Sequence, residues 1–439
     1  MKRILIGLVA ASLLGGCGVL GGKEKKVTPT VGERIPVLSR ETVLQVEPAL
    51  AGVPVTLPAA VTNEEWAQPG GNAAKSMGHL TLGSSLGQAW RVGIGAGSSG
   101  KGQLAAPPVL GGGRIYTIDT QAVVRAISPE NGATLWQTQV RGGTAQLNSL
   151  FGGGVSFDNG RVYATNGAGY AAALDASNGS IVWTVRPGGP LRGAPTIANE
   201  NVYVISQDNQ LFALNPVDGA TRWSGAGAVE IAGVLGAAAP AAAQGTVVAG
   251  FSSGELTAFR YENSQIVWQD ALARTSISTA VTSLSDIDAS PVIDSGRVYA
   301  IGQGGRMVAI ELITGQRIWE INVAGISTPW VAGNWIFVVT DQAQLLALDR
   351  TSGKIRWMTQ LAGYRDVKDK KGRISWVGPI LAGDRLILAN SAGQIVNVSP
   401  QDGAVQSTIE TRMPVSISPI VANNTLYVLH DNGQLTAWR

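Results

Sequence analysis

Two glycine motifs near the N-terminus have the residue spacing of known chemical sites. Gly83-Ser-Ser-Leu-Gly87 has the G-x-S-x-G spacing of a serine nucleophile turn, and Gly95-Ala-Gly-Ser-Ser-Gly100 has the G-x-G-x-x-G spacing of a dinucleotide loop. No helical pattern follows either motif. The serine therefore lacks its strand-to-helix turn, and a phosphate would lack a helix N-terminus. We expect both matches to be coincidental.

The residues that usually bind metals or form disulfides are scarce. The chain has two histidines, His79 and His430, and a single cysteine, Cys17. One cysteine cannot form an intramolecular disulfide, and two isolated histidines do not make a metal site. The sequence therefore predicts no metal site and no cofactor, and we expect both histidines to be turn or core residues.

The N-terminus has the pattern of a secretory signal. Lys2 and Arg3 precede an apolar run, Ile4–Leu14, which is too short to span a bilayer. The run ends in Leu14-Gly-Gly-Cys17, which resembles the lipobox of bacterial lipoproteins. The resemblance implies that residues 1–16 are a signal peptide and that Cys17 is lipidated. We expect anchoring to the periplasmic face of the outer membrane, since several acyl chains together anchor stably.

Two further segments precede the repeats that fill the rest of the chain. Residues 17–60 contain recurring prolines without sustained periodicity, which predicts a lipidated N-terminus followed by an extended tether. We expect residues 61–87 to be an extension that packs on the domain that follows.

The overall charge argues against a nucleic-acid partner. The formal net charge is +3, and two of the basic residues lie in the predicted signal peptide. The longest basic run, Lys368–Arg373, is interrupted by Asp369. No basic stripe runs along the chain, so we expect no nucleic-acid binding.

The remainder of the chain is a repeat. Each unit has an (Ala/Ser/Thr)-Pro or similar step, two apolar strand patterns, a turn rich in Gly and Asp, and a strand that ends at Trp. The spacing is about 44 residues, which fits four-stranded propeller blades. The repeated tryptophans are Trp90, Trp136, Trp183, Trp223, Trp268, Trp319 and Trp357, and Ser407 occupies the eighth equivalent position.

The register of the repeats shows how the ring closes. The last unit supplies three strands, and an orphan strand, residues 88–92, stands at the N-terminal end. Pairing the two would remove both free edges. The sequence therefore predicts an all-β fold: an eight-bladed β-propeller of four-stranded antiparallel blades over residues 88–439, closed by an N-terminal strand. We expect the repeated Trp to seal each blade onto the next.

The repeat resembles the quinoprotein-type propeller repeat, as in Ala173-Leu-Asp175 followed by Gly179 and Trp183. The resemblance implies the fold, but enzymes and scaffolds share it. A pyrroloquinoline-quinone-dependent dehydrogenase is one alternative, although the chain lacks the adjacent cysteines of many such enzymes. A generic periplasmic binding propeller is another.

A narrower resemblance is to the propeller lipoproteins of the outer-membrane β-barrel assembly machinery. It depends on the lipobox, on the eight repeats and on two segments, Pro190-Leu-Arg-Gly193 and Leu284-Ser-Asp-Ile-Asp288. It implies a non-catalytic scaffold that assists insertion of outer-membrane proteins by binding a periplasmic domain of the barrel-forming subunit. Unfolded outer-membrane proteins are a further expected partner. The implied partner-binding residues are Leu191, Arg192, Asp286 and Asp288.

Strand order places these residues on one face without reference to any family. Both segments lie in connections between blades, which must cross the same face of a propeller, and binding residues gather in such loops. We expect an exposed Leu191 beside Arg192, and alanine variants that weaken binding with little loss of stability. The alternative is that Asp286 and Asp288 cap their own turn and that Arg192 pairs with one of them.

Overall fold

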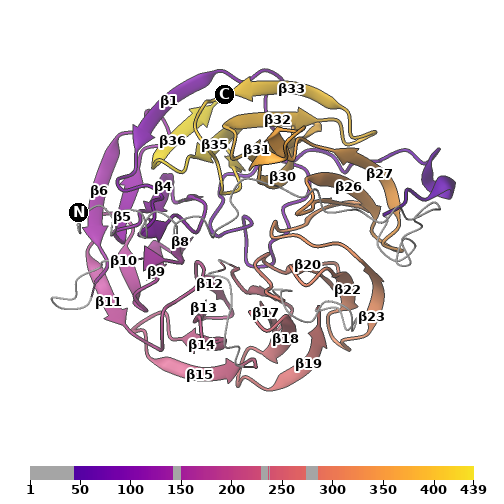
Figure 1. Ribbon diagram of the computed structural model, residues 1–439. Helices are drawn as coiled ribbons and strands as arrows, with labels where there is room; N and C mark the ends of the chain where they lie inside the picture. Colours follow the sequence, from indigo (N-terminus) through magenta and orange to yellow (C-terminus); the bar gives the residue numbers. More distant parts are fainter. Residues whose placement is uncertain (1–43, 142–149, 229–235, 237, 273–284) are drawn as a thin grey trace, which may run out of the picture. The chain divides into compact units, whose positions relative to one another are not determined.

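The structure is a computed structural model that describes residues 44–141, 150–228, 236, 238–272 and 285–439. It divides into two units, residues 1–43 and 44–439, and all described residues belong to the second. Eight four-stranded antiparallel sheets surround a central axis (Figure 1). The only helix among the described residues is one turn of 3-10 helix, η1 (Pro48–Leu50). The predicted eight-bladed, all-β propeller is confirmed.

Blades 1 to 4 follow one another along the chain, each from its innermost to its outermost strand. Blade 1 comprises β3 (Val109–Gly111), β4 (Arg114–Ile118), β5 (Val123–Ile127) and β6 (Thr134–Gln139). Blade 2 comprises β8 (Gly153–Asp158), β9 (Arg161–Asn166), β10 (Ala171–Asp175) and β11 (Ile181–Val185). Blade 3 comprises β12 (Thr196–Ala198), β13 (Asn201–Ile205), β14 (Gln210–Leu214) and β15 (Thr221–Ala226). Blade 4 comprises β16 (Ala241–Ala243), β17 (Thr246–Gly250), β18 (Glu255–Arg260) and β19 (Ile266–Ala271).

Blades 5 to 8 continue the same order. Blade 5 comprises β20 (Val292–Asp294), β21 (Arg297–Ile301), β22 (Met307–Glu311) and β23 (Arg317–Ile321). Blade 6 comprises β24 (Trp330–Ala332), β25 (Trp335–Val339), β26 (Gln344–Asp349) and β27 (Ile355–Gln360). Blade 7 comprises β30 (Trp376–Ala382), β31 (Arg385–Asn390), β32 (Gln394–Val398) and β33 (Val405–Glu410). Blade 8 comprises β34 (Ile420–Ala422), β35 (Thr425–Leu429), β36 (Gln434–Trp438) and β1 (Gln88–Gly93).

Two small strand pairs lie outside the blades. The pair β2 (Gly102–Gln103) and β7 (Leu150–Phe151) is parallel, and the hairpin of β28 (Tyr364–Asp366) and β29 (Lys371–Arg373) is antiparallel. The hairpin lies in the connection between blades 6 and 7. We call the side that carries the connections between blades the loop face, and the opposite side, where the first strand of each blade turns into the second, the turn face.

The ring closes as the sequence predicts. Strand β1 pairs antiparallel with β36, from Gln88 opposite Trp438 to Gly93 opposite Gln434. The two ends of the domain are therefore hydrogen-bonded to each other, and neither strand is left with an unpaired inner edge. The middle strands are almost entirely buried, whereas most residues of the outermost strands are exposed or partly exposed.

The repeated tryptophans join each blade to the next. The indole Nε1 of Trp319 donates to the carbonyl oxygen of Arg350 in blade 6, at 3.0 Å. Its ring packs on Gly353, where an added Cβ would lie 2.6 Å from the ring. The other tryptophans donate in the same way to the last hairpin of the next blade: Trp90 to Pro129, Trp136 to Ala176, Trp183 to Pro216, Trp223 to Tyr261, Trp268 to Leu312 and Trp357 to Pro400.

This docking explains why Ser407 replaces the eighth tryptophan. A tryptophan at that position of blade 7 would dock on the hairpin between the last two strands of blade 8. Blade 8 has no such hairpin, because β36 and β1 come from opposite ends of the chain. The position has no turn carbonyl to bind.

Residues 61–83, which we call the belt, run around the turn face and bond to every blade. In Figure 1 this indigo segment crosses the centre of the ring. The amide of Val61 donates to the carbonyl of His79 at 2.9 Å, so the beginning and the end of the belt are bonded to each other. In chain order its partners are Val421 in blade 8, Leu110 in blade 1, Phe157 in blade 2, Ile197 in blade 3, Ala242 in blade 4, Ile293 in blade 5, Trp330 in blade 6 and Leu381 in blade 7.

The segment before the belt also lies against the propeller. Val46 forms a parallel bridge to Ile355 on the outer strand of blade 6, and Val55 exchanges backbone bonds with the side chain of Gln401 in blade 7. Part of the predicted tether, residues 44–60, is therefore attached to blades 6 and 7. None of the helices described is long and apolar enough to cross a membrane.

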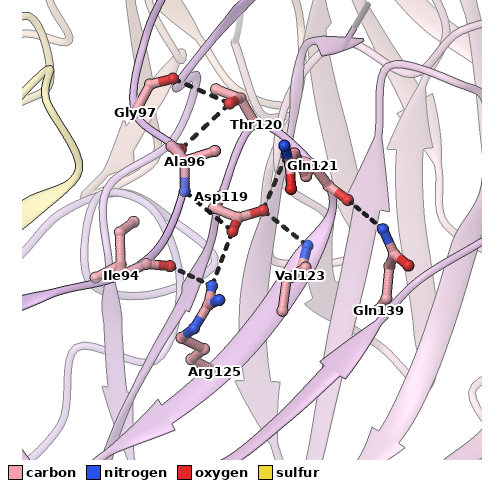
Figure 2. A network of polar contacts seen from close by, with 9 residues as sticks. All are labelled: Ile94, Ala96, Gly97, Asp119, Thr120, Gln121, Val123, Arg125 and Gln139. Atoms are coloured by element: carbon pink, nitrogen blue, oxygen red, sulfur yellow. Dashed lines mark hydrogen bonds and ion pairs between the residues drawn. The ribbon is translucent and has the colours of Figure 1, made fainter. Parts of the chain in front are cut away.

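A buried carboxylate fixes the connection that leads from β1 into blade 1. Figure 2 shows Asp119, which accepts hydrogen bonds from the amides of Ala96, Gln121 and Val123. The same carboxylate pairs with Arg125 Nη1 at 2.8 Å. Arg125 also donates to the carbonyl of Ile94. This network locks the closing strand onto blade 1.

Candidate partner-binding site

The Leu191–Arg192 step lies on the loop face, in the connection from blade 2 to blade 3. The amide of Arg192 donates to the carbonyl of Ile205 at 2.9 Å. The carbonyl of Arg192 accepts from the amide of Gly153 at 2.6 Å. Because the backbone is bonded to both neighbouring blades, the direction of the Arg192 side chain is fixed.

Leu191 does not have the exposure that we expected. Its accessible fraction is 0%, and it packs in the core between blades 2 and 3 with Trp183, Ile197 and Phe212. The expectation of an exposed leucine is wrong, because the connection between these blades is short and its apolar residue fills the seam below it. Leu191 therefore supports the loop from beneath.

The structure brings Arg192, Asp286 and Asp288 together. Arg192 Nη2 donates to Asp286 Oδ1 at 2.7 Å and to Asp288 Oδ1 at 3.1 Å. The aspartates come from the connection between blades 4 and 5, so blades 3 and 4 lie between the two connections that meet here. The side chains are 2%, 1% and 9% accessible for Arg192, Asp286 and Asp288. Arg192 pairs with both aspartates, which extends the alternative that the sequence left open.

One guanidinium faces two carboxylates in this cluster. Burial raises the pKa of Asp288 above its usual range, and the neighbouring Asp286 carboxylate raises it further, while Arg192 opposes both effects. The second oxygen of Asp288 accepts from Gln303 Nε2 at 2.6 Å. Among the described residues, the cluster therefore has one guanidinium for two carboxyl groups.

The guanidinium retains unused hydrogen-bonding capacity. Arg192 Nε and Nη1 are buried and have no acceptor within the described part of the chain. A buried, charged donor without an acceptor is unfavourable by roughly 1–3 kcal/mol or more. The cluster is therefore able to accept a further oxygen ligand, such as a carboxylate or a carbonyl.

The sequence did not identify two members of this site. Gln303 belongs to a turn of blade 5 and has no motif around it. Gly236 belongs to the connection from blade 3 to blade 4, and a Cβ there would lie 1.5 Å from Asp288 Oδ1 and 2.5 Å from Arg192 Nη2. A glycine in an Ala-rich stretch carries no signal of such an approach, which appears only when three connections meet.

The cluster borders a cavity in the central channel. The cavity has a volume of about 470 Å³, and Asp288, Gln303 and Gly236 line it. The belt residues Trp66 and Lys75 also line it. The remaining walls come largely from the segments that lead into the innermost strands, so the cavity lies along the axis of the propeller.

The two histidines that the sequence analysis singled out have structural roles. His79 Nε2 accepts from the amide of Asp384 at 3.1 Å, and His430 Nε2 is 3.0 Å from Thr436 Oγ1, so both are core or turn residues. Across the described ranges, no group of three His, Cys, Asp or Glu side chains could hold a metal ion. Cys17 and Leu284 lie outside the described residues.

The chain was compared with known proteins. The sequence model of the family "Outer membrane protein assembly factor BamB" matches residues 119–359. The BamB of Yersinia pestis is 24% identical over 100% of this chain and 98% of its own length. The crystal structure of BamB from Moraxella catarrhalis has a TM-score of 0.65 at 20% identity, and covers 81% of this chain and 98% of its own.

A structural neighbour with a different function shows the limit of the fold as an argument. The quinohemoprotein alcohol dehydrogenase of Comamonas testosteroni has a TM-score of 0.67 at 13% identity, and covers 86% of this chain and 81% of its own. That similarity shows only that the two proteins share the propeller fold. The sequence match separates the two groups: with the family model covering more than half of its length, this chain belongs to the BamB family of outer membrane protein assembly factors.

Proposed function

We propose that the protein is a non-catalytic lipoprotein scaffold of the outer-membrane β-barrel assembly complex. In this role it binds a periplasmic domain of the barrel-forming subunit and assists the folding and insertion of outer-membrane proteins. The observation that carries the proposal is the Arg192–Asp286–Asp288 cluster on the loop face, which stands at the residues that resemble the family's contact segments.

The cluster supports binding in two ways. Asp288 is its most accessible member and lines the central cavity, where its carboxyl group could meet a basic group of the partner. Arg192 holds both aspartates and keeps two donors for an acceptor of the partner. Leu191 contributes by fixing the loop and does not contact the partner.

Burial of the cluster corrects the expectation that alanine variants have little effect on stability. Removing Arg192 alone would take away the guanidinium that both buried carboxylates share, which costs about 3–5 kcal/mol. A binding test therefore needs a variant that removes every charge at once. The triple variant Arg192→Met, Asp286→Asn, Asp288→Asn leaves no unpaired buried ion.

Capture from detergent-solubilised membranes tests the proposal. The wild-type protein should recover the barrel-forming subunit, and the folded triple variant should recover far less. The control is Asp208→Asn, an exposed carboxylate in a loop-face turn of blade 3. Equal recovery by the triple variant would remove the cluster from the interface, and dye-linked alcohol oxidation in the presence of added quinone and Ca²⁺ would support an enzyme.

The lipid anchor at Cys17 is a separate part of the proposal. Replacing Cys17 with Ala should abolish incorporation of labelled palmitate and release the processed protein from the membrane fraction. The anchor requires the thiol, whereas the propeller does not. Undiminished palmitate incorporation into the variant would exclude Cys17 as the acylated residue.

A further inference from the structure

The central cavity contains a buried amine without a counter-charge. Lys75, in the belt, is 3% accessible and lines the cavity. Its Nζ donates to Thr196 Oγ1 at 3.1 Å, and it forms no ion pair with any described residue. An ammonium has three donors, so this one retains two that no described residue uses.

The charged groups that line the cavity differ in the partners that they have. Besides Lys75, these groups are Asp288 and Asp431 among the described residues. Asp288 pairs with Arg192 and Gln303, and Asp431 accepts from the amide and the hydroxyl of Ser416 at 2.9 and 2.8 Å. Asp288 therefore has a cationic partner and Asp431 has two neutral donors, whereas Lys75 has a single neutral partner among the described residues.

The belt builds this site and holds Lys75 in an uncommon conformation. The backbone φ of Lys75 is +64°, in the left-handed region. A Cβ at Gly70 would lie 2.9 Å from Lys75 Cβ, so the turn closes tightly around the lysine. Such conformations persist where the surroundings over-determine them and often mark functional sites.

The walls of the cavity suit a ligand with an apolar body. Trp66 and Trp330 both line it, with ring centroids 6.1 Å apart and planes inclined by 19°. The Nε1 of Trp66 is buried and has no acceptor among the described residues. A volume of about 470 Å³ lies within the range of small-molecule sites, roughly 300–1,000 Å³.

We propose that the belt-closed channel binds a monocarboxylate, whose oxygens accept hydrogen bonds from Lys75 Nζ while its apolar part lies along the tryptophans. A carboxylate suits the site better than a phosphate, because one ammonium balances one negative charge and Asp288 and Asp431 disfavour a second. The carboxylate can belong to a small acid or to the end of a peptide. The proposal does not depend on the assembly role.

Desolvation supports the assignment. Burial lowers the pKa of Lys75 to about 7. A bound carboxylate would stabilise the ammonium, so binding and protonation should be coupled. Affinity should fall by about tenfold between about pH 6 and pH 8, since the protonated fraction falls by that factor.

Calorimetry with the full chain tests the proposal. The probes are phenylacetate with its neutral amide, phenylacetamide, and a short peptide with a free or an amidated C-terminus. Binding of phenylacetate points to a small acid, and stronger binding of the free peptide points to a chain end. Both support the proposal, whereas equal binding of the amides, or no binding of either acid, overturns it.

A pair of variants assigns the binding to the lysine. Lys75→Met should lose at least ten-fold in affinity for the acids and lose the pH dependence, whereas Lys101→Met, at an exposed lysine, should change neither. If Lys75→Met does not fold, a carbon NMR titration of the wild-type lysine side chains replaces it. Phenylacetate should then raise the pKa of the lysine that titrates near neutrality, and an unchanged titration overturns the proposal.

Discussion

Arg192 and Asp286 are 94 residues apart in the chain, and their side chains form a buried ion pair of 2.7 Å. The pair joins the connection before blade 3 to the connection before blade 5, with blades 3 and 4 between them. Asp288 shares the same guanidinium nitrogen. The site is therefore a property of the closed ring, because neither connection can form it alone.

Removal of the guanidinium should destabilise the protein more than removal of the whole cluster. Arg192→Ala should lower the free energy of unfolding by about 3–5 kcal/mol. The triple variant Arg192→Met, Asp286→Asn, Asp288→Asn should lose much less, because no buried charge remains. Urea denaturation measures both, with Arg186→Ala, at an exposed arginine of the same connection, as the control. Equal losses for the single and triple variants would contradict a buried ion pair.

The contact between Trp319 and Gly353 should make any side chain at position 353 destabilising. Gly353→Ala places a Cβ 2.6 Å from the indole ring and also strains a backbone with φ +71°. Gly296→Ala has a similar φ of +73° but meets no atom within 4 Å, so it isolates the backbone strain. Thermal denaturation should show an additional loss of about 1–3 kcal/mol for Gly353→Ala. Equal losses would show that the indole moves away freely.

Stability should depend on pH through Lys75. Its pKa is lowered to about 7 in the folded protein, so between there and its ordinary value of 10.5 the unfolded state binds more protons. The wild-type protein should therefore gain stability relative to Lys75→Met as pH rises through this window, by at most about 1.4 kcal/mol per pH unit. Urea denaturation at several pH values measures this difference. A pH-independent difference would show that the amine is solvated.

Loss of the belt should expose the inner strands. The amides of Ala242, Ile293 and Gly383 donate to belt carbonyls at 2.8–2.9 Å. In a chain that begins at residue 84, these amides should exchange hydrogen faster and unfolding should occur at lower temperature. A chain that begins at residue 44 keeps the belt and serves as the control. Unchanged exchange at these amides would mean that the innermost strands are protected without the belt.

The repeat made the propeller predictable, and even its irregular position has a physical explanation. Ser407 interrupts the tryptophan series at blade 7, because blade 8 lacks the hairpin on which an indole ring would dock. The ring closure by residues 88–92 followed from counting strands. These features depend on periodic local patterns, which a single sequence displays directly.

The site was only partly predictable. The charges of Arg192, Asp286 and Asp288 were placed on one face by strand order, but their burial depends on how three connections meet, which no local pattern records. Leu191 was misjudged because a leucine in a polar loop has the same sequence signature whether it faces solvent or a seam. The path of the belt was not foreseen either, since its bonds go to eight distant strands and leave no periodicity.

The belt also determines how tension along the chain would be distributed. A pull on the N-terminal side of residue 44 would load the Val46–Ile355 bridge first. It would next load the contact of Val55 with Gln401, and then the belt contacts, beginning with the bond of Val61 to His79, before it reached the pairing of β1 with β36. Each contact that breaks would lengthen the chain between the pulled end and the propeller. The belt contacts would therefore break before the β1–β36 pairing that closes the propeller.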